Sequence, residues 1–294
     1  MTQEVNTSTI ITNRDAPAQF IRDADTHAHK ERFFELLSPV GGRKAAVLGV
    51  IGAILFFAVW EIGHYATPEE GRRFLPSVEQ VVGRLFFLFT EKEFIYDVLQ
   101  SCLRIFGSFF AASAVAIPLG IMLGSFGGFK ALINPTVSGL RYLPAASFIP
   151  LLLVWFGPSE TAKMALLFLG VLFFLIAMVL DNTEAVQREY TEAALTMGAS
   201  RKRIILEVIV PAAMPAIIDS MRTMIAVGWT YLVIAEIVGA KDGIGAVMMR
   251  AGRFLNVDTI MAGIFMIGVL GVLTDIMFRI LQRVLFPWNV KKKV

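Results

Sequence analysis

The chain has 294 residues, of which 56% are hydrophobic and only 17% are charged, and its mean hydropathy is +0.66. Soluble domains have about 45–50% apolar and about 25% charged residues, so this composition excludes an ordinary soluble protein and indicates one that is embedded in a bilayer. The net charge of +3 does not indicate a nucleic-acid partner, and a single cysteine, Cys102, excludes an intrachain disulfide or a multi-cysteine metal site.

The first 44 residues are polar and include the acidic side chains of Asp23, Asp25, Glu31 and Glu35. A secretory signal needs a basic start followed by an apolar run, and this segment has neither. We therefore expect residues 1–44 to form a cytoplasmic tail that is partly disordered. Residues 30–40 fit either a short helix on the membrane surface or a plain linker.

Six apolar stretches follow, and each approaches the length of about 20 residues that a helix needs to cross the hydrocarbon core. They are residues 45–60, 105–129, 142–159, 164–180, 212–237 and 259–274. They lack the alternation of barrel strands and therefore predict helices. The fold class we expect is an all-α membrane protein with about six transmembrane helices in one domain, residues 45–294. In the third stretch, Pro144 and Pro150 predict a kink, a break or a partly re-entrant segment.

Residues 76–100, between the first two stretches, have an amphipathic pattern. Ser77 is placed to cap a helix with Gln80 at its third position, and apolar side chains then recur on one face. Charged residues such as Arg84 and Lys92 keep this segment out of the hydrocarbon. We expect a helix that lies on the outer membrane surface.

The basic residues predict the orientation, because lysine and arginine accumulate on the cytoplasmic side of membrane proteins. With the N-terminus inside, the cytoplasmic segments hold Arg43, Lys44, Lys130, Arg141, Arg188, Arg201, Lys202, Arg203, Arg279, Arg283, Lys291, Lys292 and Lys293. The basic residues of the outer loops are diluted by acidic ones. Both termini are therefore expected in the cytoplasm.

The most informative segment is the inside loop expected at residues 183–203, which is too apolar for a solvated loop and too charged to insert. Thr183 is placed to cap one helix, and Gly198 to end it in the left-handed conformation. Ser200 is placed to cap a second helix that begins at Arg201. The pattern predicts two helices with a sharp turn at the membrane surface.

Within this loop, Glu192-Ala193-Ala194 is followed by Gly198 and, further on, by Val208-Ile209-Val210-Pro211. The pattern resembles the EAA motif of ABC importer permeases, although that family ends it in Ile-x-Leu-Pro. In that family the loop is the coupling helix, which docks in a groove of the ATPase subunit. The resemblance assigns ATPase coupling to Glu192, Ala193, Ala194, Gly198, Arg201 and Pro211. The alternative is an interfacial helix with a chance EAA string.

Residues 75–290 further resemble the subfamily of these permeases that imports nitrate, sulfonates such as taurine, or bicarbonate. The matching segments include Phe74-Leu75-Pro76-Ser77, Trp155-Phe156-Gly157, Gly228-Trp229-Thr230 and Gly243-Ile244-Gly245. The chain has Arg141-Tyr142-Leu143-Pro144 where Arg-Pro-Val-Pro is common, which leaves the substrate open and admits a pyrimidine vitamin precursor.

This resemblance implies a type I ABC importer permease fold with a cytoplasmic coupling helix, in the bacterial inner membrane. It implies as partners two ABC ATPase subunits, a second permease copy in a homodimer, an external substrate-binding protein and the surrounding lipid. The substrate path would then run between the two permeases.

Polar or small residues inside the spans are the candidates for lining that path, because ionisable groups in a membrane usually face an interior. The candidates are Ser147, Arg222, Trp229, Thr230 and Glu236. Two have competing interpretations: Arg222 has the spacing to pair with Asp219, and Glu236 is near the outer interface.

Gly120 and Gly124, in the second stretch, form a face of small residues that is suited to close helix packing.

Enzyme signatures are missing, so we expect no catalytic residue, no metal and no cofactor. Gly124–Lys130 lacks the Gly-Lys-Ser/Thr ending of a phosphate loop, and ATP hydrolysis is expected in separate subunits. An ion-coupled secondary transporter is an alternative, but inverted repeats and buried ion-coupling charges are not clear in the sequence. A membrane enzyme would need a cluster of His, Asp or Glu at the membrane edge.

Overall fold

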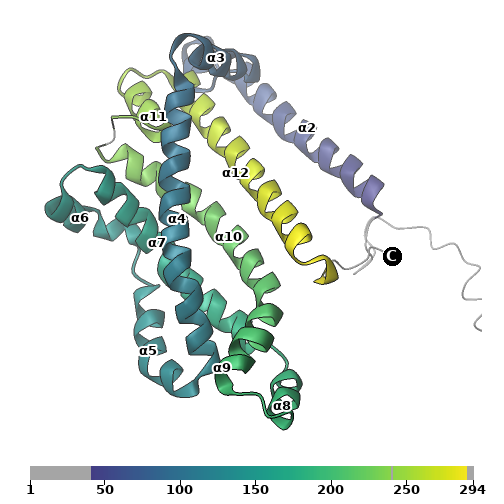
Figure 1. The fold of residues 1–294 in the computed structure, drawn as a ribbon. Coiled ribbons are helices and arrows are strands. Elements are labelled where there is room, and N and C mark those ends of the chain that lie inside the picture. The colour runs from purple at the N-terminus through teal and green to yellow at the C-terminus, as the bar shows by residue number, and fades with distance from the viewer. Residues whose placement is uncertain (1–40, 240, 290–294) are drawn as a thin grey trace, which may run out of the picture. The chain divides into compact units, whose positions relative to one another are not determined.

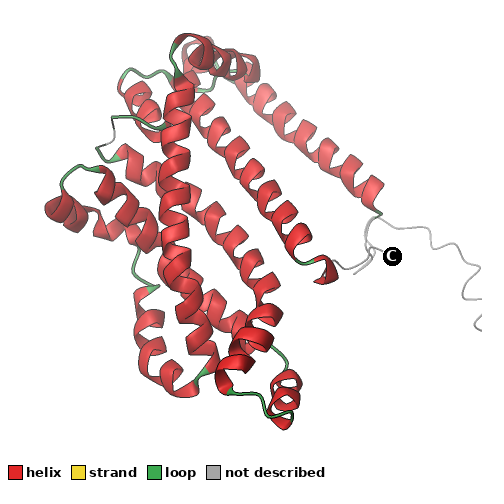
Figure 2. Ribbon diagram, in the orientation of Figure 1, coloured by secondary structure: helices red, strands yellow, loops and turns green. Residues whose placement is uncertain are grey.

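The computed structural model describes residues 41–239 and 241–289, so most of the predicted tail lies outside the described residues. The described part is helical and contains no strand, which confirms the all-α prediction (Figure 2). Its elements are α2 (Gly42–Ala66), η1 (Glu69–Phe74), α3 (Val78–Glu91), α4 (Phe94–Ser125), α5 (Gly127–Leu140), η2 (Ala145–Phe148), α6 (Ile149–Phe156), α7 (Glu160–Glu184), α8 (Arg188–Thr196), α9 (Arg201–Ile204), the π-helical turn η3 (Ile205–Ile209), α10 (Val210–Ile237), α11 (Ile244–Arg253), α12 (Val257–Leu285) and η4 (Pro287–Asn289).

The chain divides into two units, residues 1–59 and residues 60–294. The described residues of the first unit belong almost entirely to α2, and their side chains are exposed. An apolar helix with exposed side chains is what lipid contact requires. The predicted boundary at residues 44 and 45 stays a prediction.

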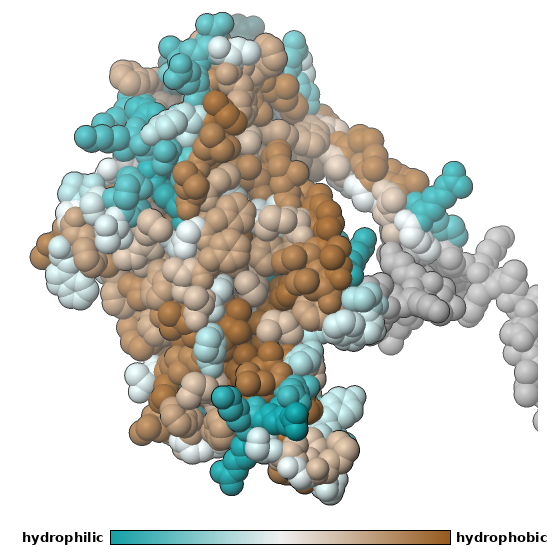
Figure 3. Space-filling view, viewed as in Figure 1, coloured by the Kyte–Doolittle hydropathy of each residue, from teal (hydrophilic) through white to brown (hydrophobic). Residues whose placement is uncertain are grey.

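The second unit is built on α4, α7 and α10, which supply most of its buried apolar side chains. Ile105 and Phe109 of α4, Leu175 of α7 and Ile217 and Leu232 of α10 are almost completely buried. Within this unit, α3 and α11 lie at one end of the long helices, and α8 and α9 lie at the other (Figure 1). Between those ends, apolar side chains cover most of the face seen in Figure 3.

The most extensive helix contact in this unit is between α4 and α7. A Cβ atom at Gly120 would lie 2.6 Å from Val179 Cβ, and one at Gly124 would lie 2.6 Å from Thr183 Cβ. Because real Cβ atoms do not approach that closely, only glycine fits at these two positions. The predicted small face is therefore confirmed, and its partner is α7.

Five described helices are long and apolar enough to cross a membrane, namely α2, α4, α7, α12 and the continuous run of residues 201–237. Gly127–Leu140 and Ala145–Phe156 pass the same test together, although they meet at an angle of 82°. Counting that bent pair as one span agrees with the predicted six helices. The expected limits of the third span were wrong, because the bent pair begins at Gly127 and not at residue 142.

The segment 76–100, which was expected on the outer surface, also differs from its prediction. It forms α3 as far as Glu91, but residues 94–100 already belong to the long helix α4. Asp97 and Arg104 obscured the start of this span, since both side chains are paired inside the protein.

A capping box starts α3, as predicted. Gln80 N donates to Ser77 Oγ at 3.2 Å, and Ser77 N donates to Gln80 Oε1 at 3.0 Å. Glu61 Oε2 accepts a further hydrogen bond from Val78 N at 3.1 Å. These bonds satisfy backbone donors that a helix start leaves without partners.

We expect Ser77→Ala to lower the free energy of unfolding by about 1 kcal/mol, the usual cost of losing an N-cap. Ser77→Asp should retain most of the stability, because aspartate caps equally well. Thermal unfolding of the purified protein in detergent, followed by circular dichroism, measures both variants. Equal losses for both would contradict a capping role.

Candidate functional site

The predicted hairpin of residues 183–203 is present as α8 and α9, joined by a tight turn. Gly198 has φ = +79°, Gly198 N donates to Leu195 O at 2.9 Å, and Ala199 N donates to Ala194 O at 3.0 Å. This pair of bonds is a Schellman motif, which glycine supports because it adopts left-handed backbone without strain. Ser200 Oγ accepts from Arg203 N at 3.4 Å, so Ser200 caps α9 as predicted.

The predicted start of the first helix was wrong. Helix α7 continues through Glu184, and Thr183 Oγ1 donates to Val179 O at 2.7 Å inside it. Helix α8 begins only at Arg188, after Gln187, whose side chain makes no capping bond. Thr183 packs against Gly124 of α4 and is therefore part of the helix bundle.

The EAA residues divide between the two sides of α8. Ala194 is buried, while Glu192, Ala193 and Gly198 are exposed. Three large side chains of the hairpin are also exposed: Tyr190, Leu195 and Met197, the last at 82%. We call Tyr190, Glu192, Ala193, Leu195 and Met197 the α8 patch. An apolar patch on a helix outside the membrane spans is typical of a protein interface.

Arg201 and Pro211 connect this patch to the membrane helix α10. Arg201 is exposed at the first position of α9, and the π-helical turn η3 follows, where Val210 N donates to Ile205 O. Pro211 comes next and has no N–H to donate, which a wider turn accommodates. Helix α8 contacts both α9 and η3, the two elements that lead into α10.

A groove of about 530 Å³ runs between α10 and α12. Trp229 and Thr230, both predicted path residues, line it together with Met248 of α11 and with Gly268 and Gly271 of α12. Trp229 Nε1 donates to Thr274 Oγ1 at 3.1 Å, which fixes the indole between the two helices. The structure thus brings two of the five path candidates to one surface.

The other three candidates do not line this groove. Ser147 is exposed in η2, at the bend of the broken span. Arg222 pairs with Asp219 at 3.0 Å, as its spacing predicted, and also with Asp275 of α12 at 3.4 Å. Glu236 is 1% exposed and pairs with Arg104 at 2.8 Å. The ion pairs of Arg222 and Glu236 favour structural roles for these two residues.

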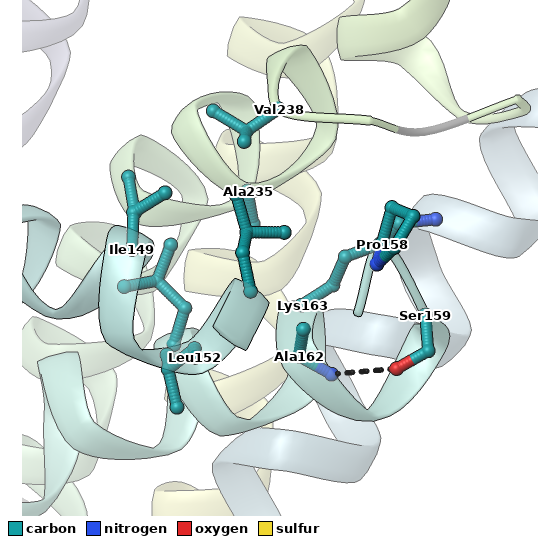
Figure 4. A pocket seen from close by; sticks show the side chains of 10 residues that line it. Ile149, Leu152, Pro158, Ser159, Ala162, Lys163, Ala235 and Val238 are labelled. Atoms are coloured by element: carbon teal, nitrogen blue, oxygen red, sulfur yellow. Dashed lines mark hydrogen bonds between the residues drawn. The ribbon is translucent and has the colours of Figure 1, made fainter. Parts of the chain in front are cut away.

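Near Lys163 lies a small cavity of about 20 Å³, between α6, the start of α7 and the end of α10 (Figure 4). Apart from Ser159 and Lys163, its lining is apolar, and Ser159 Oγ accepts from Ala162 N at 3.3 Å. A volume of this size holds about one water molecule. The cavity is therefore too small to be a site for an organic solute.

An ion cluster around the buried side chain of Arg104 was not predicted from the sequence. This side chain is 3% exposed and contacts carboxylates of Glu160, Glu236 and Asp242, which come from three other segments. A single arginine beside a long apolar run was the available signal, because a charge there needs partners inside the protein.

Comparison with known proteins gives a family for this chain. Residues 116–287, more than half of the sequence and including the α8–α9 hairpin, match the family model of the binding-protein-dependent transport system inner membrane component. The taurine transport system permease protein TauC of Escherichia coli (strain K12) is 34% identical over 221 residues, which are 74% of this chain and 80% of TauC.

Two more distant relatives agree with this match. The putative aliphatic sulfonates transport permease protein SsuC of Bacillus subtilis (strain 168) is 33% identical over 58% of this chain and 63% of that protein. The bicarbonate transport system permease protein CmpB of Synechococcus elongatus is 25% identical over 81% of this chain and 88% of that protein.

Among solved structures, a chain of the inward-facing MetNI methionine ABC transporter superposes with a TM-score of 0.59. The match covers 65% of this chain and 95% of that chain, at 18% sequence identity. It confirms the predicted type I permease fold. The chain therefore belongs to the binding-protein-dependent transport system inner membrane components, which are the permease subunits of ABC transporters.

Proposed function

We propose that this permease forms the membrane path of an ABC importer for small sulfonates or related anions. The two termini and α8 would lie in the cytoplasm, and α3 and α11 would face the outside of the inner membrane. The predicted tail, residues 1–44, would precede the membrane domain, residues 45–294. A second copy of the chain, two ATPase subunits and an external substrate-binding protein would complete the transporter.

The observation that carries the proposal is the exposed α8 patch. Tyr190, Leu195 and Met197 lie on α8 or at its C-cap, outside the candidate membrane spans, and the rest of this chain leaves them exposed. Such side chains need a protein partner. The connection from α8 through η3 into α10 supports an ATPase as this partner, because it would transmit the partner's motion to a helix that lines the groove.

The anion class rests on the relatives, whose names specify taurine, aliphatic sulfonates and bicarbonate. We propose Trp229 and Thr230 as path-lining residues. The groove they line is mostly apolar, and its lining includes no lysine or arginine. A path without a fixed cation would pass an anion without retaining it, and selection would then fall to the external binding protein.

Uptake by proteoliposomes tests this function. The permease would be reconstituted with its ATPase and its substrate-binding protein, and radiolabelled taurine would be supplied with the binding protein outside and ATP inside. We expect uptake only when both ATP and the binding protein are present. Ion-driven uptake of taurine by this chain alone, without ATP, would show a secondary transporter instead.

A further inference from the structure

Arg104 of α4 uses all five N–H groups of its guanidinium inside the protein. Nε donates to Glu160 Oε2 at 2.6 Å and Nη2 to Glu160 Oε1 at 2.9 Å, a bidentate pair with the start of α7. Nη1 donates to Glu236 Oε1 at 2.8 Å and to Asp242 O at 3.0 Å, and Nη2 also contacts Asp242 Oδ1. One side chain thus joins α4, α7, α10 and the segment that leads into α11.

The same cluster holds the beginning of α11. Three consecutive backbone N–H groups donate to side chains of other helices: Gly243 N to Asp97 Oδ1 at 2.7 Å, Ile244 N to Ser101 Oγ at 3.0 Å, and Gly245 N to Glu236 Oε2 at 2.8 Å. A Cβ atom at Gly245 would lie 2.7 Å from Glu236 Cβ, so the backbone lies directly against this carboxylate's stem. The start of α11 is therefore fixed by Glu236, and Glu236 is neutralised by Arg104.

Helix α11 in turn forms one end of the groove between α10 and α12. Helix α10 ends just before α11 in the chain, and α12 begins just after it. The groove-lining residues nearest to α11 are therefore Ile234, the last one on α10, and Ile264, the first one on α12. Met248 of α11 lines the groove at this end. Met248 also packs tightly on α12, because a Cβ atom at Gly263 would lie 2.5 Å from its Cγ.

We propose that Arg104 is a positioning residue for transport: acting through Glu236, it holds α11 in the place where Met248 closes the outer end of the groove. The proposal rests on the proposed function, which puts α11 at the outer side. Glu160 and Asp242 are 54% and 32% exposed, whereas Arg104 and Glu236 are buried. The cluster therefore reaches the outer surface, where a docking protein would act on its two exposed carboxylates and release α11.

The physical reason for a large effect is the burial of Glu236. Removing one partner of a buried ion pair leaves the other charge uncompensated, which is much more costly than losing an exposed pair. Without Arg104, the Glu236 carboxylate is expected to move toward water and to abandon Gly245 N. The beginning of α11 then loses one of its three anchors.

The test is the outside accessibility of a cysteine in the groove. Gly268→Cys is introduced together with Cys102→Ala, because Gly268 lines the groove and has open space beside its Cα. The complex, without nucleotide, is treated from the outside with a membrane-impermeant sulfonated maleimide. We expect Arg104→Gln to raise the labelling rate by about tenfold or more, since a buried charge has lost its partner. Arg104→Lys should give an intermediate rate, because lysine keeps the positive charge but cannot form the bidentate pair with Glu160.

The matched control is Arg84→Gln, the same change at the same end of the unit. Arg84 pairs with Asp258 at 2.7 Å but is partly exposed, so its loss should leave the labelling rate unchanged. Asp242→Asn, which weakens the cluster from its exposed side, should act in the same direction as Arg104→Gln and serves if that variant does not fold. Unchanged labelling in every foldable cluster variant would overturn the proposal.

A cysteine in place of Met197, on the α8 patch, separates this test from that of the proposed function. It should react only after the membrane is permeabilised, and its rate should not depend on Arg104. Labelling of this cysteine from the outside would disprove the proposed orientation. An equal rise at both positions would show general loosening of the protein, which also overturns the positioning role.

Discussion

Replacing Gly120 by leucine is expected to prevent accumulation of folded permease in the membrane. The first carbon of any side chain there would lie 2.6 Å from Val179 Cβ and 3.0 Å from the backbone oxygen of Ile176. Backbone cannot move aside as a flexible side chain can, so α4 and α7 would have to separate. Overpacking of this kind costs about 3 kcal/mol, a large share of the stability of a typical domain. The amount of monodisperse protein after detergent extraction measures the effect.

Gly139→Leu is the matched control for this experiment. Gly139 is also in a helix, α5, but no atom lies within 4 Å of the position of its missing Cβ. The same substitution should therefore leave the yield close to that of the unmodified chain. Equal yields for the two variants would mean that α4 and α7 are not packed through Gly120.

The contact between α4 and α7 illustrates what local sequence can predict. The spacing of Gly120 and Gly124 indicated a face for close packing, because small residues four apart lie on one side of a helix. The sequence could not identify the partner, since many apolar helices offer a complementary surface. Thr183, one of the two α7 residues at this contact, was predicted to cap a helix, and the structure does not contain that cap.

The ends of the spans were predicted less well than their existence. Charges at Asp97 and Arg104 lowered the apparent hydropathy at the start of α4, although both are satisfied by partners far away in the sequence. In the third span, Pro144 and Pro150 correctly predicted a break. The half before the break was not predicted, because Lys130 and Arg141 indicated a cytoplasmic segment between the second and third spans. A hydropathy scale penalises every charged residue and takes no account of ion pairs. It therefore misplaces the end of a membrane span where a charged side chain is paired inside the protein.

The hairpin was predicted closely because its determinants are local. Gly198 supplies the left-handed turn and Ser200 the cap, and each acts within a few residues of its own position. The Arg104 cluster is the opposite case, since the three acidic residues that pair with Arg104 lie 56, 132 and 138 positions away from it in the sequence. No sequence pattern within a single segment can predict a contact between segments so far apart.

The double variant Glu192→Lys with Gly198→Val is expected to abolish copurification of the ATPase while the permease still inserts normally. The charge reversal alters the exposed face of α8, and valine at φ = +79° is strained because its branched side chain disfavours left-handed backbone. The turn would open and move α8 relative to α9. Loss of a central contact at a packed interface costs about 2–4 kcal/mol, enough to lower affinity by a factor of at least about thirty. Pull-down of the ATPase by tagged permease measures the effect.

Two matched variants show whether the turn and the charge act as argued. Gly198→Asn should retain more ATPase than Gly198→Val, because asparagine tolerates the left-handed region that valine avoids. Glu91→Lys, the same charge reversal at the end of α3, should leave ATPase binding unchanged, because α3 lies at the opposite end of the unit. Full ATPase recovery with the double variant would contradict the coupling role of α8. Loss of the ATPase with Glu91→Lys would show that net charge, and not the α8 patch, controls assembly.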